Sequence, residues 1–336
     1  RQLATMLESG VTLIRSIDVI LSQVESEKLN KTLLSVKSSI EQGGSLSTAL
    51  ANHPKVFNQF WVSLVEVGEA SGTIPNVLNK LAYYLEQQAA FRSAIISGII
   101  YPAILFCVAM GAVTFFAFVV GPKFEAIFTQ MGVKLPLITA VLLNTFKFLK
   151  SNFLLMLLSA IGLVFALKQY TKTYYGKMQL EKVIFNLPIV GNISKLIIVE
   201  RFAAQMAILL DAGVPILYAL DITERLVDNH TCALIVSQIK DGVKKGELLV
   251  DPMEKSGFFP PMCIQMIMVG HDTGEFRKML KHVSAYYQGI VETFMKRFAT
   301  IVEPFMLVFM GGIIGTIVIA MFLPMFDIVK LGGGGG

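Results

Sequence analysis

Few side chains in this sequence have the types and spacings that could support chemistry. The candidate metal ligands are three cysteines and four histidines: Cys107, Cys232, Cys263, His53, His230, His271 and His282. They occur singly, without the Cys-x-x-Cys or mixed Cys/His spacing of a zinc site. The sequence also lacks a phosphate-binding GxxxxGKS/T, an HExxH and a GxSxG motif. We therefore expect no catalytic residue, no metal and no cofactor, and we expect the chain not to be an enzyme.

Ionisable residues inside an apolar stretch would indicate a transporter, because a charge in hydrocarbon is costly and is usually functional. Ile95–Val120 and Phe305–Leu323 contain none, and Arg92 and Glu303 lie only at their edges. This pattern disfavours a pump or a proton relay. A membrane transporter or channel and a membrane-bound enzyme remain alternatives of other classes. The first requires a polar stripe in the spans, and the second requires a convergent catalytic set.

The sharpest local feature is the turn Val67–Ile74, which combines glycines with carboxylates. Gly68 and Gly72 permit backbone conformations that other residues avoid, and Glu69 is expected near the N-terminus of the next helix, where the helix dipole favours an anion. Two interpretations stay open: a capped turn of fixed geometry, and a docking surface for a partner. The docking candidates from this turn and its second copy are Glu66, Gly68, Glu69, Gly72, Gly270, Asp272 and Gly274.

The composition indicates that much of the chain faces lipid. Of its 336 residues 54% are hydrophobic and 16% are charged, whereas soluble domains carry roughly 25% charged residues. Ile95–Val120 and Phe305–Leu323 are long enough to cross about 30 Å of hydrocarbon. Phe153–Leu167 is shorter, but Lys150 and Lys168 flank it, and their stems can reach the headgroups. The net charge of +5 is spread along the chain, so we expect no nucleic acid partner.

The chain contains an internal duplication. Val67–Ile74 matches Val269–Phe276, and Gly44-Ser45-Leu46 matches Gly246-Glu247-Leu248 at the same offset. Each copy has helical periodicity and leads into a membrane span. Two copies that face the same way require a return crossing between them, and Phe153–Leu167 is the only candidate for it.

The predicted fold is therefore an all-α membrane protein with two homologous cytosolic helical bundles and three transmembrane helices. Lysines beside the second and third spans favour the cytosol for both bundles. The predicted boundaries are a first cytosolic domain at 1–92, a transmembrane helix at 93–121, a periplasmic connection at 122–152, a second transmembrane helix at 153–168, a second cytosolic domain at 169–297, a third transmembrane helix at 298–325 and a periplasmic tail at 326–336. We expect Gly332–Gly336 to be an added linker or an arbitrary end.

Small residues and prolines within the spans are candidates for helix packing. Gly311 and Gly315 form a GxxxG pattern, and such spacing allows close helix approach. Packing within one chain and dimerisation both stay open. The full set is Pro102, Gly111, Pro304, Gly311, Gly315 and Pro324.

Several segments together resemble the type II secretion system F family, which includes the inner-membrane platform proteins of type IV pilus assembly and of type II secretion. These segments are Arg1–Val11, Gly43–Leu50, Val67–Gly72, Tyr101-Pro102, Glu303-Pro304 and Leu323–Phe326. The resemblance covers nearly all of the chain, in the right order. It implies six-helix cytosolic bundles, three crossings, no catalytic activity and a cytosolic segment before Arg1.

The resemblance also implies a function and partners. We expect a multi-pass platform protein of the bacterial inner membrane that couples a hexameric cytosolic assembly ATPase to the insertion or extraction of pilin. The interpretation favoured is a type IV pilus platform. The alternatives are the platform of a type II secretion pseudopilus, and a competence or archaellum-type machine. The other expected partners are pseudopilin, other inner-membrane assembly proteins, the lipid bilayer and further copies of the chain in a homo-oligomer.

Overall fold

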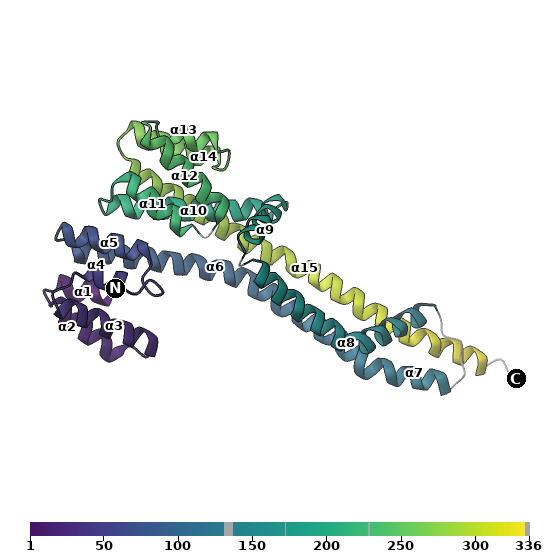
Figure 1. Ribbon diagram of the computed structural model, residues 1–336. Helices are drawn as coiled ribbons and strands as arrows, with labels where there is room; N and C mark the ends of the chain where they lie inside the picture. The colour runs from purple at the N-terminus through teal and green to yellow at the C-terminus, as the bar shows by residue number, and fades with distance from the viewer. Residues whose placement is uncertain (131–136, 172, 228, 333–336) are drawn as a thin grey trace. The chain divides into compact units, whose positions relative to one another are not determined.

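The computed structural model describes residues 1–130, 137–171, 173–227 and 229–332, and every regular element in these ranges is helical (Figure 1). This confirms the predicted all-α fold. The chain forms two compact units. Unit 1 comprises Arg1–Ser93 and Tyr174–Glu292, and unit 2 comprises Ala94–Thr173 and Thr293–Gly336.

The first repeat in unit 1 contains six helices. They are α1 (Gln2–Glu8), α2 (Leu13–Gln23), α3 (Glu27–Glu41), α4 (Leu46–Ala51), α5 (Gln59–Ala70) and the first part of α6 (Ile74–Phe115). Side-chain oxygens of Ser26, Ser45 and Asn58 cap the N-termini of α3, α4 and α5 by accepting backbone N–H bonds that the helices leave unpaired. Their apolar faces enclose a core that includes Ile17 and Val36.

The second repeat has the same order of helices. They are the C-terminal part of α10 (Val190–Asp211), α11 (Ile216–Leu226), α12 (His230–Lys244), α13 (Val250–Lys255), α14 (Pro261–Asp272) and the first part of α15 (Phe276–Gly332). An additional helix, α9 (Tyr174–Asn186), precedes them. Six helices in each repeat agree with the six-helix bundles that the resemblance implied.

Left-handed glycines support the duplication and refine its alignment. Gly43 has φ +90°, as does Gly246, so these two residues occupy the same position in the two turns. The pairing of Gly44 with Gly246 at the sequence level is therefore wrong by one residue. Gly43 and Gly246 are 203 positions apart, whereas Gly68 and Gly270 are 202 apart, so the first copy carries one extra residue between Gly43 and Gly68.

The two repeats meet in one buried cluster within unit 1. Phe60 and Leu64 of α5, with Leu81 of α6, lie in the same buried cluster as Phe202 of α10 and Leu220 of α11. The hydroxyls of Ser63 and Tyr218 also hydrogen-bond at 3.2 Å across the two repeats. Because burial of such side chains is worth about 1.5–3 kcal/mol each, the contact between the repeats stabilises unit 1.

Unit 2 contains the apolar helices. The part of α6 in this unit continues into a π-helical turn, η1 (Phe116–Val120), and α7 (Gly121–Gln130), and it is joined by α8 (Leu137–Tyr170) and the rest of α15. Three helical stretches are long and apolar enough to cross a membrane: Ile74–Ile127, Leu137–Tyr170 and Phe276–Leu323. Large side chains of α8 such as Leu155 and Phe165 are 67% and 70% exposed, which is expected where the solvent is lipid.

A fourth span is suggested by length and composition alone. Gly176–Asn186 and Val190–Asp211 pass the same criteria as a pair, but they are bent by 113°. Phe202, Met206 and Leu209 of α10 are buried in the core of unit 1, so the apolar character of this helix is explained without lipid. Three spans therefore remain, as predicted from the sequence. The short apolar stretch Phe153–Leu167 lies within the 34-residue helix α8, and the exact boundaries of the spans stay predictions.

Candidate functional site

The turn between α5 and α6 depends on two glycines. A Cβ atom at Gly68 would lie 3.1 Å from Cγ2 of Val77 and 3.3 Å from Cα of Ile74, so its absence lets the two helices approach closely. Gly72 has φ +68°, a conformation that side chains disfavour. Both residues are thus required by the geometry of the turn itself.

The turn between α14 and α15 repeats this arrangement. A Cβ atom at Gly270 would lie 2.8 Å from Cβ and Cγ of Met279 and 3.1 Å from Cα of Phe276. Gly274 has φ +72°. The four glycines among the docking candidates therefore have a local structural role, and a role in docking stays a prediction.

Glu69 lies elsewhere than expected. Its carboxylate accepts hydrogen bonds from the backbone N–H groups of Leu46 at 2.5 Å and Ser47 at 3.0 Å, and from the hydroxyl of Ser47. The anion thus caps the N-terminus of α4, not that of α6. Because α4 and α5 pack on each other, the side chain of Glu69 on α5 can reach the N-terminus of α4.

The exposed docking candidates are Glu66 and Asp272. Both lie on the last turns of their helices, α5 and α14, and both are exposed to solvent. The second copy carries His271 at the position of Glu69, and α13 has no side-chain cap at its N-terminus. The two turns therefore differ in charge and in hydrogen bonding, although their backbones agree.

Two carboxylates of α10 were not singled out from the sequence. Asp211 pairs through Oδ2 with Nζ of Lys80 on α6 at 3.1 Å and with Nζ of Lys281 on α15 at 3.3 Å. Three turns away, Oε1 of Glu200 accepts hydrogen bonds from Nε2 of Gln88 on α6 at 3.2 Å and from Oγ of Ser284 on α15 at 3.1 Å. Each carboxylate therefore links the two helices that lead into unit 2.

The charge state of these two carboxylates differs. Burial opposes ionisation of Asp211, but the hydrogen bonds and charges of Lys80 and Lys281 outweigh it and lower the pKa of its carboxyl group. Burial raises the pKa of Glu200 to about 7, against the hydrogen bonds from Ser284 and Gln88. Oε2 of Glu200 is also buried without a hydrogen-bond partner among the described residues, which disfavours the anion further.

A cavity of about 470 Å³ lies between the two links. Its lining comes from α6, α10 and α15, and it includes Tyr83, Gln87, Ala204, His282 and Gln288 beside the linked residues. This volume is within the range of small-molecule sites. Its principal feature is that three helices from two repeats meet there.

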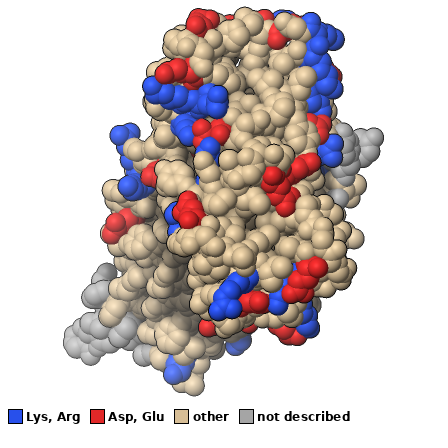
Figure 2. All heavy atoms as spheres, turned by 90° about the vertical axis from the view of Figure 1, so that its left-hand side faces the viewer, with Lys and Arg blue, Asp and Glu red and all other residues tan. Residues whose placement is uncertain are grey.

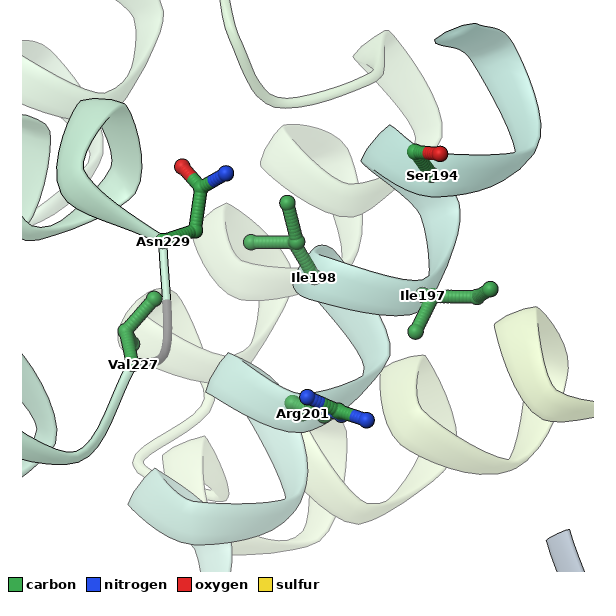
Figure 3. A pocket seen from close by; sticks show the side chains of 6 residues that line it. All are labelled: Ser194, Ile197, Ile198, Arg201, Val227 and Asn229. Atoms are coloured by element: carbon green, nitrogen blue, oxygen red, sulfur yellow. The ribbon is translucent and has the colours of Figure 1, made fainter. Parts of the chain in front are cut away.

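A smaller pocket of about 180 Å³ lies beside the start of α12 (Figure 3). Ile198 and Arg201 come from α10, and Val227 and Asn229 precede α12. Oδ1 of Asn229 is used to cap α12, accepting from the backbone N–H of Cys232 at 2.9 Å. In Figure 3 the polar ends of Asn229 and Arg201 point in different directions, so the pocket lacks convergent polar groups.

The candidate metal ligands do not come together in the part of the chain that the structure describes. Within those residues, no group of three or more His, Cys, Asp or Glu side chains is placed to hold an ion. Burial raises the pKa of Cys232 and of Cys263 to about 12, so neither thiol is ionised at neutral pH. These cysteines belong to the core.

Figure 2 shows basic and acidic side chains interspersed over the face that it presents. A nucleic-acid site usually concentrates Lys and Arg on one face. The face that Figure 2 presents shows no such concentration.

The packing candidates of unit 2 divide into two groups. Pro102 and Pro304 lie inside α6 and α15. A Cβ atom at Gly111, Gly311 or Gly315 would meet nothing within 4 Å, so packing within this chain does not explain these glycines. The side chain of Pro324 lies outside the described residues.

Two other glycines of unit 2 make the close contacts. A Cβ atom at Gly98 on α6 would lie 3.0 Å from Cβ of Met295 on α15, and one at Gly121 would lie 3.0 Å from Cδ2 of Phe146 on α8. Neither glycine could be recognised from the sequence, since each stands alone and lacks a GxxxG pattern.

Comparisons with known proteins agree with the duplication. A family model described as type II secretion system (T2SS), protein F, matches residues 1–122 and 202–324. The chain is 36% identical over 330 residues to the type IV pilus assembly protein PilC of Thermus thermophilus, covering 98% of this chain and 81% of that protein. It is 31% identical over 328 residues to PilC of Myxococcus xanthus, covering 98% and 79%. It is 30% identical over 328 residues to type II secretion system protein F of Aeromonas hydrophila, covering 98% and 84%.

Proposed function

The chain belongs to the type II secretion system protein F family, and from this premise we propose that it is the inner-membrane platform of a type IV pilus assembly machine. In this role it couples a hexameric cytosolic assembly ATPase to the insertion or extraction of pilin. The names of its relatives support a role in pilus assembly, because the similar proteins from T. thermophilus and M. xanthus are type IV pilus assembly proteins.

One observation carries the coupling role. α6 and α15 each run without a break from unit 1 into an apolar span, over 42 and 57 residues. At 1.5 Å per residue these helices are about 60 Å and 85 Å long. Each helix stays continuous across an internal proline, Pro102 in α6 and Pro304 in α15. We infer that a displacement in unit 1 is passed through this continuous helix to the span.

The links made by α10 join these two helices. Asp211 holds Lys80 and Lys281, and Glu200 holds Gln88 and Ser284. A partner that moves the helical bundle would therefore displace both spans together. This arrangement suits a scaffold that transmits motion and does no chemistry of its own.

The three spans support placing both repeats on one side of the membrane. Each repeat leads into a span, and α8 supplies the return crossing. The lysines beside the spans favour the cytosol for that side, where an ATPase would meet them. The inner membrane of a bacterium is the corresponding location.

The platform of a type II secretion pseudopilus is the second candidate. The similarity to type II secretion system protein F of A. hydrophila favours it. The chain is 30% identical to that protein and 31% identical to PilC of M. xanthus, so the two identities hardly differ. The two candidates share the scaffold and differ in the subunit that is assembled. Binding to pilin in preference to pseudopilin would favour the pilus machine.

Co-purification tests the proposal. The full chain in detergent should retain the assembly ATPase and the major pilin of the same organism. Glu66→Ala should weaken ATPase binding if the turn between α5 and α6 is the docking surface, whereas Leu34→Ala, at an exposed position on α3, serves as the matched control. Retention of neither partner by a folded chain would overturn the proposal.

A further inference from the structure

The connection between α9 and α10 is an exposed apolar elbow, defined here as Leu187, Pro188, Ile189 and Val190. The two helices that it joins are bent by 113°. Leu187, Ile189 and Val190 are 47%, 60% and 50% exposed, and the neighbouring Val183 is 59% exposed. Single exposed apolar residues are ordinary, but a contiguous group indicates a surface that something other than water covers.

The elbow holds its apolar side chains outward at an energetic cost. Ile189 has φ +72° and ψ −63°, and it is the one non-glycine residue with positive φ among those that the structure describes. For a β-branched residue this conformation is a true outlier, costing about 1–3 kcal/mol. Such strain persists only where the surroundings enforce it.

Short-range contacts enforce this conformation. The backbone N–H of Val190 donates to the carbonyl of Pro188 at 2.9 Å, and that of Gly191 donates to the carbonyl of Leu187 at 2.9 Å. A Cβ atom at Gly191 would lie 2.3 Å from the carbonyl oxygen of Phe185, so only glycine allows the chain to fold back so tightly. The elbow is thus a built feature with a fixed shape.

The position of the elbow in the chain suggests what covers it. α8, a candidate membrane span, ends at Tyr170, and α9 begins at Tyr174. One 13-residue helix, α9, therefore separates the elbow from the end of the span along the chain. An apolar turn tethered to a span by so short a helix is within reach of the headgroup and upper acyl region.

The charges of the same segment suit a lipid surface. From the end of α8 to the first turns of α10 the sequence contains five lysines: Lys168, Lys172, Lys177, Lys182 and Lys195. The single carboxylate of this stretch, Glu181, caps α12 by accepting from the backbone N–H groups of His230 at 2.8 Å and Thr231 at 3.0 Å. Basic residues beside an apolar insertion favour anionic lipids.

We propose that the elbow is a membrane wedge: Leu187, Ile189 and Val190 insert into the lipid on the side where α8 emerges, and they anchor the second repeat to the bilayer surface. The anchoring is independent of which pilus or secretion partner the chain binds. It would fix the start of α10, the helix whose carboxylates link α6 and α15.

Tryptophan quenching by brominated lipid tests this proposal. The chain has one tryptophan, Trp61, so Trp61→Phe provides a silent background. In that background, Leu187→Trp and Val190→Trp are compared in vesicles that contain anionic lipid, with Leu34→Trp and Leu234→Trp as controls that are each 51% exposed. We expect bromination of the upper acyl chains to reduce the elbow fluorescence about twofold more than that of the controls.

Two results would overturn the proposal. One is quenching at the elbow no greater than at Leu34→Trp. The other is a blue-shifted elbow emission without quenching by brominated lipid, since that result would place the elbow against protein, such as a second copy of the chain. Using two separate elbow positions guards against a single variant that perturbs the turn.

Discussion

At the scale of single residues, the two repeats use glycine for the same purpose. Gly68 and Gly270 allow two antiparallel helices to approach, and Gly72 and Gly274 supply the left-handed turn that follows. The approach is tighter in the second copy, where the absent Cβ would lie 2.8 Å from Met279. The effect of an added methyl group should therefore be larger there.

Gly270→Ala should lower the free energy of unfolding by roughly 1–3 kcal/mol, because the new methyl group collides with Met279 and with the backbone of Phe276. Gly289→Ala in the following helix, α15, is the control, since nothing lies within 4 Å of its Cβ position and alanine favours a helix by about 1 kcal/mol. Thermal unfolding in detergent checks both. Equal melting temperatures for the two variants would contradict the claim that Gly270 is needed for the close approach of α14 and α15.

Glu69 and Glu66 separate stability from docking. Glu69→Ala removes the acceptor for the backbone N–H groups of Leu46 and Ser47 and should destabilise the first repeat by about 1–2 kcal/mol. Glu66→Ala removes an exposed carboxylate and should change stability by less than about 0.5 kcal/mol. Denaturant unfolding measures the difference, and a Glu69→Ala protein as stable as the parent would show that the cap is unimportant.

Glu200 should make stability depend on pH. Its ordinary pKa of 4.5 is raised to about 7 by burial, so the folded state binds the proton more tightly than the unfolded state does. The protonated carboxyl group of Glu200 stabilises the folded state fully below about pH 4.5. This contribution to the free energy of unfolding is lost as the pH rises through 7, by about 3 kcal/mol at most. Glu200→Gln should flatten this fall in melting temperature between pH 5 and pH 8. An unchanged pH profile would exclude Glu200 as its source.

At the scale of elements, the helices and turns could be predicted from the sequence, because periodicity, caps and glycines are local signals. The repeat turns at Gly72 and Gly274 were found in this way. The linking role of α10 could not be found, since Glu200 and Asp211 meet partners 112 and 131 residues away in the sequence. Only the packed structure brings α6, α10 and α15 together. For the same reason the sequence placed Glu69 at α6, the helix nearest along the chain.

The ion pair between Lys80 and Asp211 should be energetically modest. Their side chains are 30% and 27% exposed, so a double-mutant cycle with Lys80→Ala and Asp211→Ala should give a coupling of about 0.5–1 kcal/mol. Lys281, whose side chain is 56% exposed, should couple to Asp211 more weakly. A coupling to Lys281 that exceeds the one to Lys80 would contradict the geometry.

At the scale of the whole molecule, duplication and hydropathy together predicted three spans and two bundles. The sequence could not show that both bundles meet in a common buried cluster, which includes Phe60, Leu81 and Phe202. The sequence also did not decide whether the GxxxG glycines pack within one chain or between two chains. The structure shows open space at Gly311 and Gly315, and close contacts at Gly98 and Gly121 instead.

We propose that α6 and α15 transmit motion because they stay helical between the bundle and the membrane. The most direct test of this proposal is the insertion of a flexible Gly-Ser linker of about six residues between Ser93 and Ala94, or between Glu292 and Thr293. A matched insertion after Glu25, in the loop between α2 and α3, is the control. We predict that the variants still bind the assembly ATPase and pilin but fail to restore pili in a strain that lacks its own platform protein, whereas the control restores them. Normal piliation with a flexible linker in either helix would contradict the account.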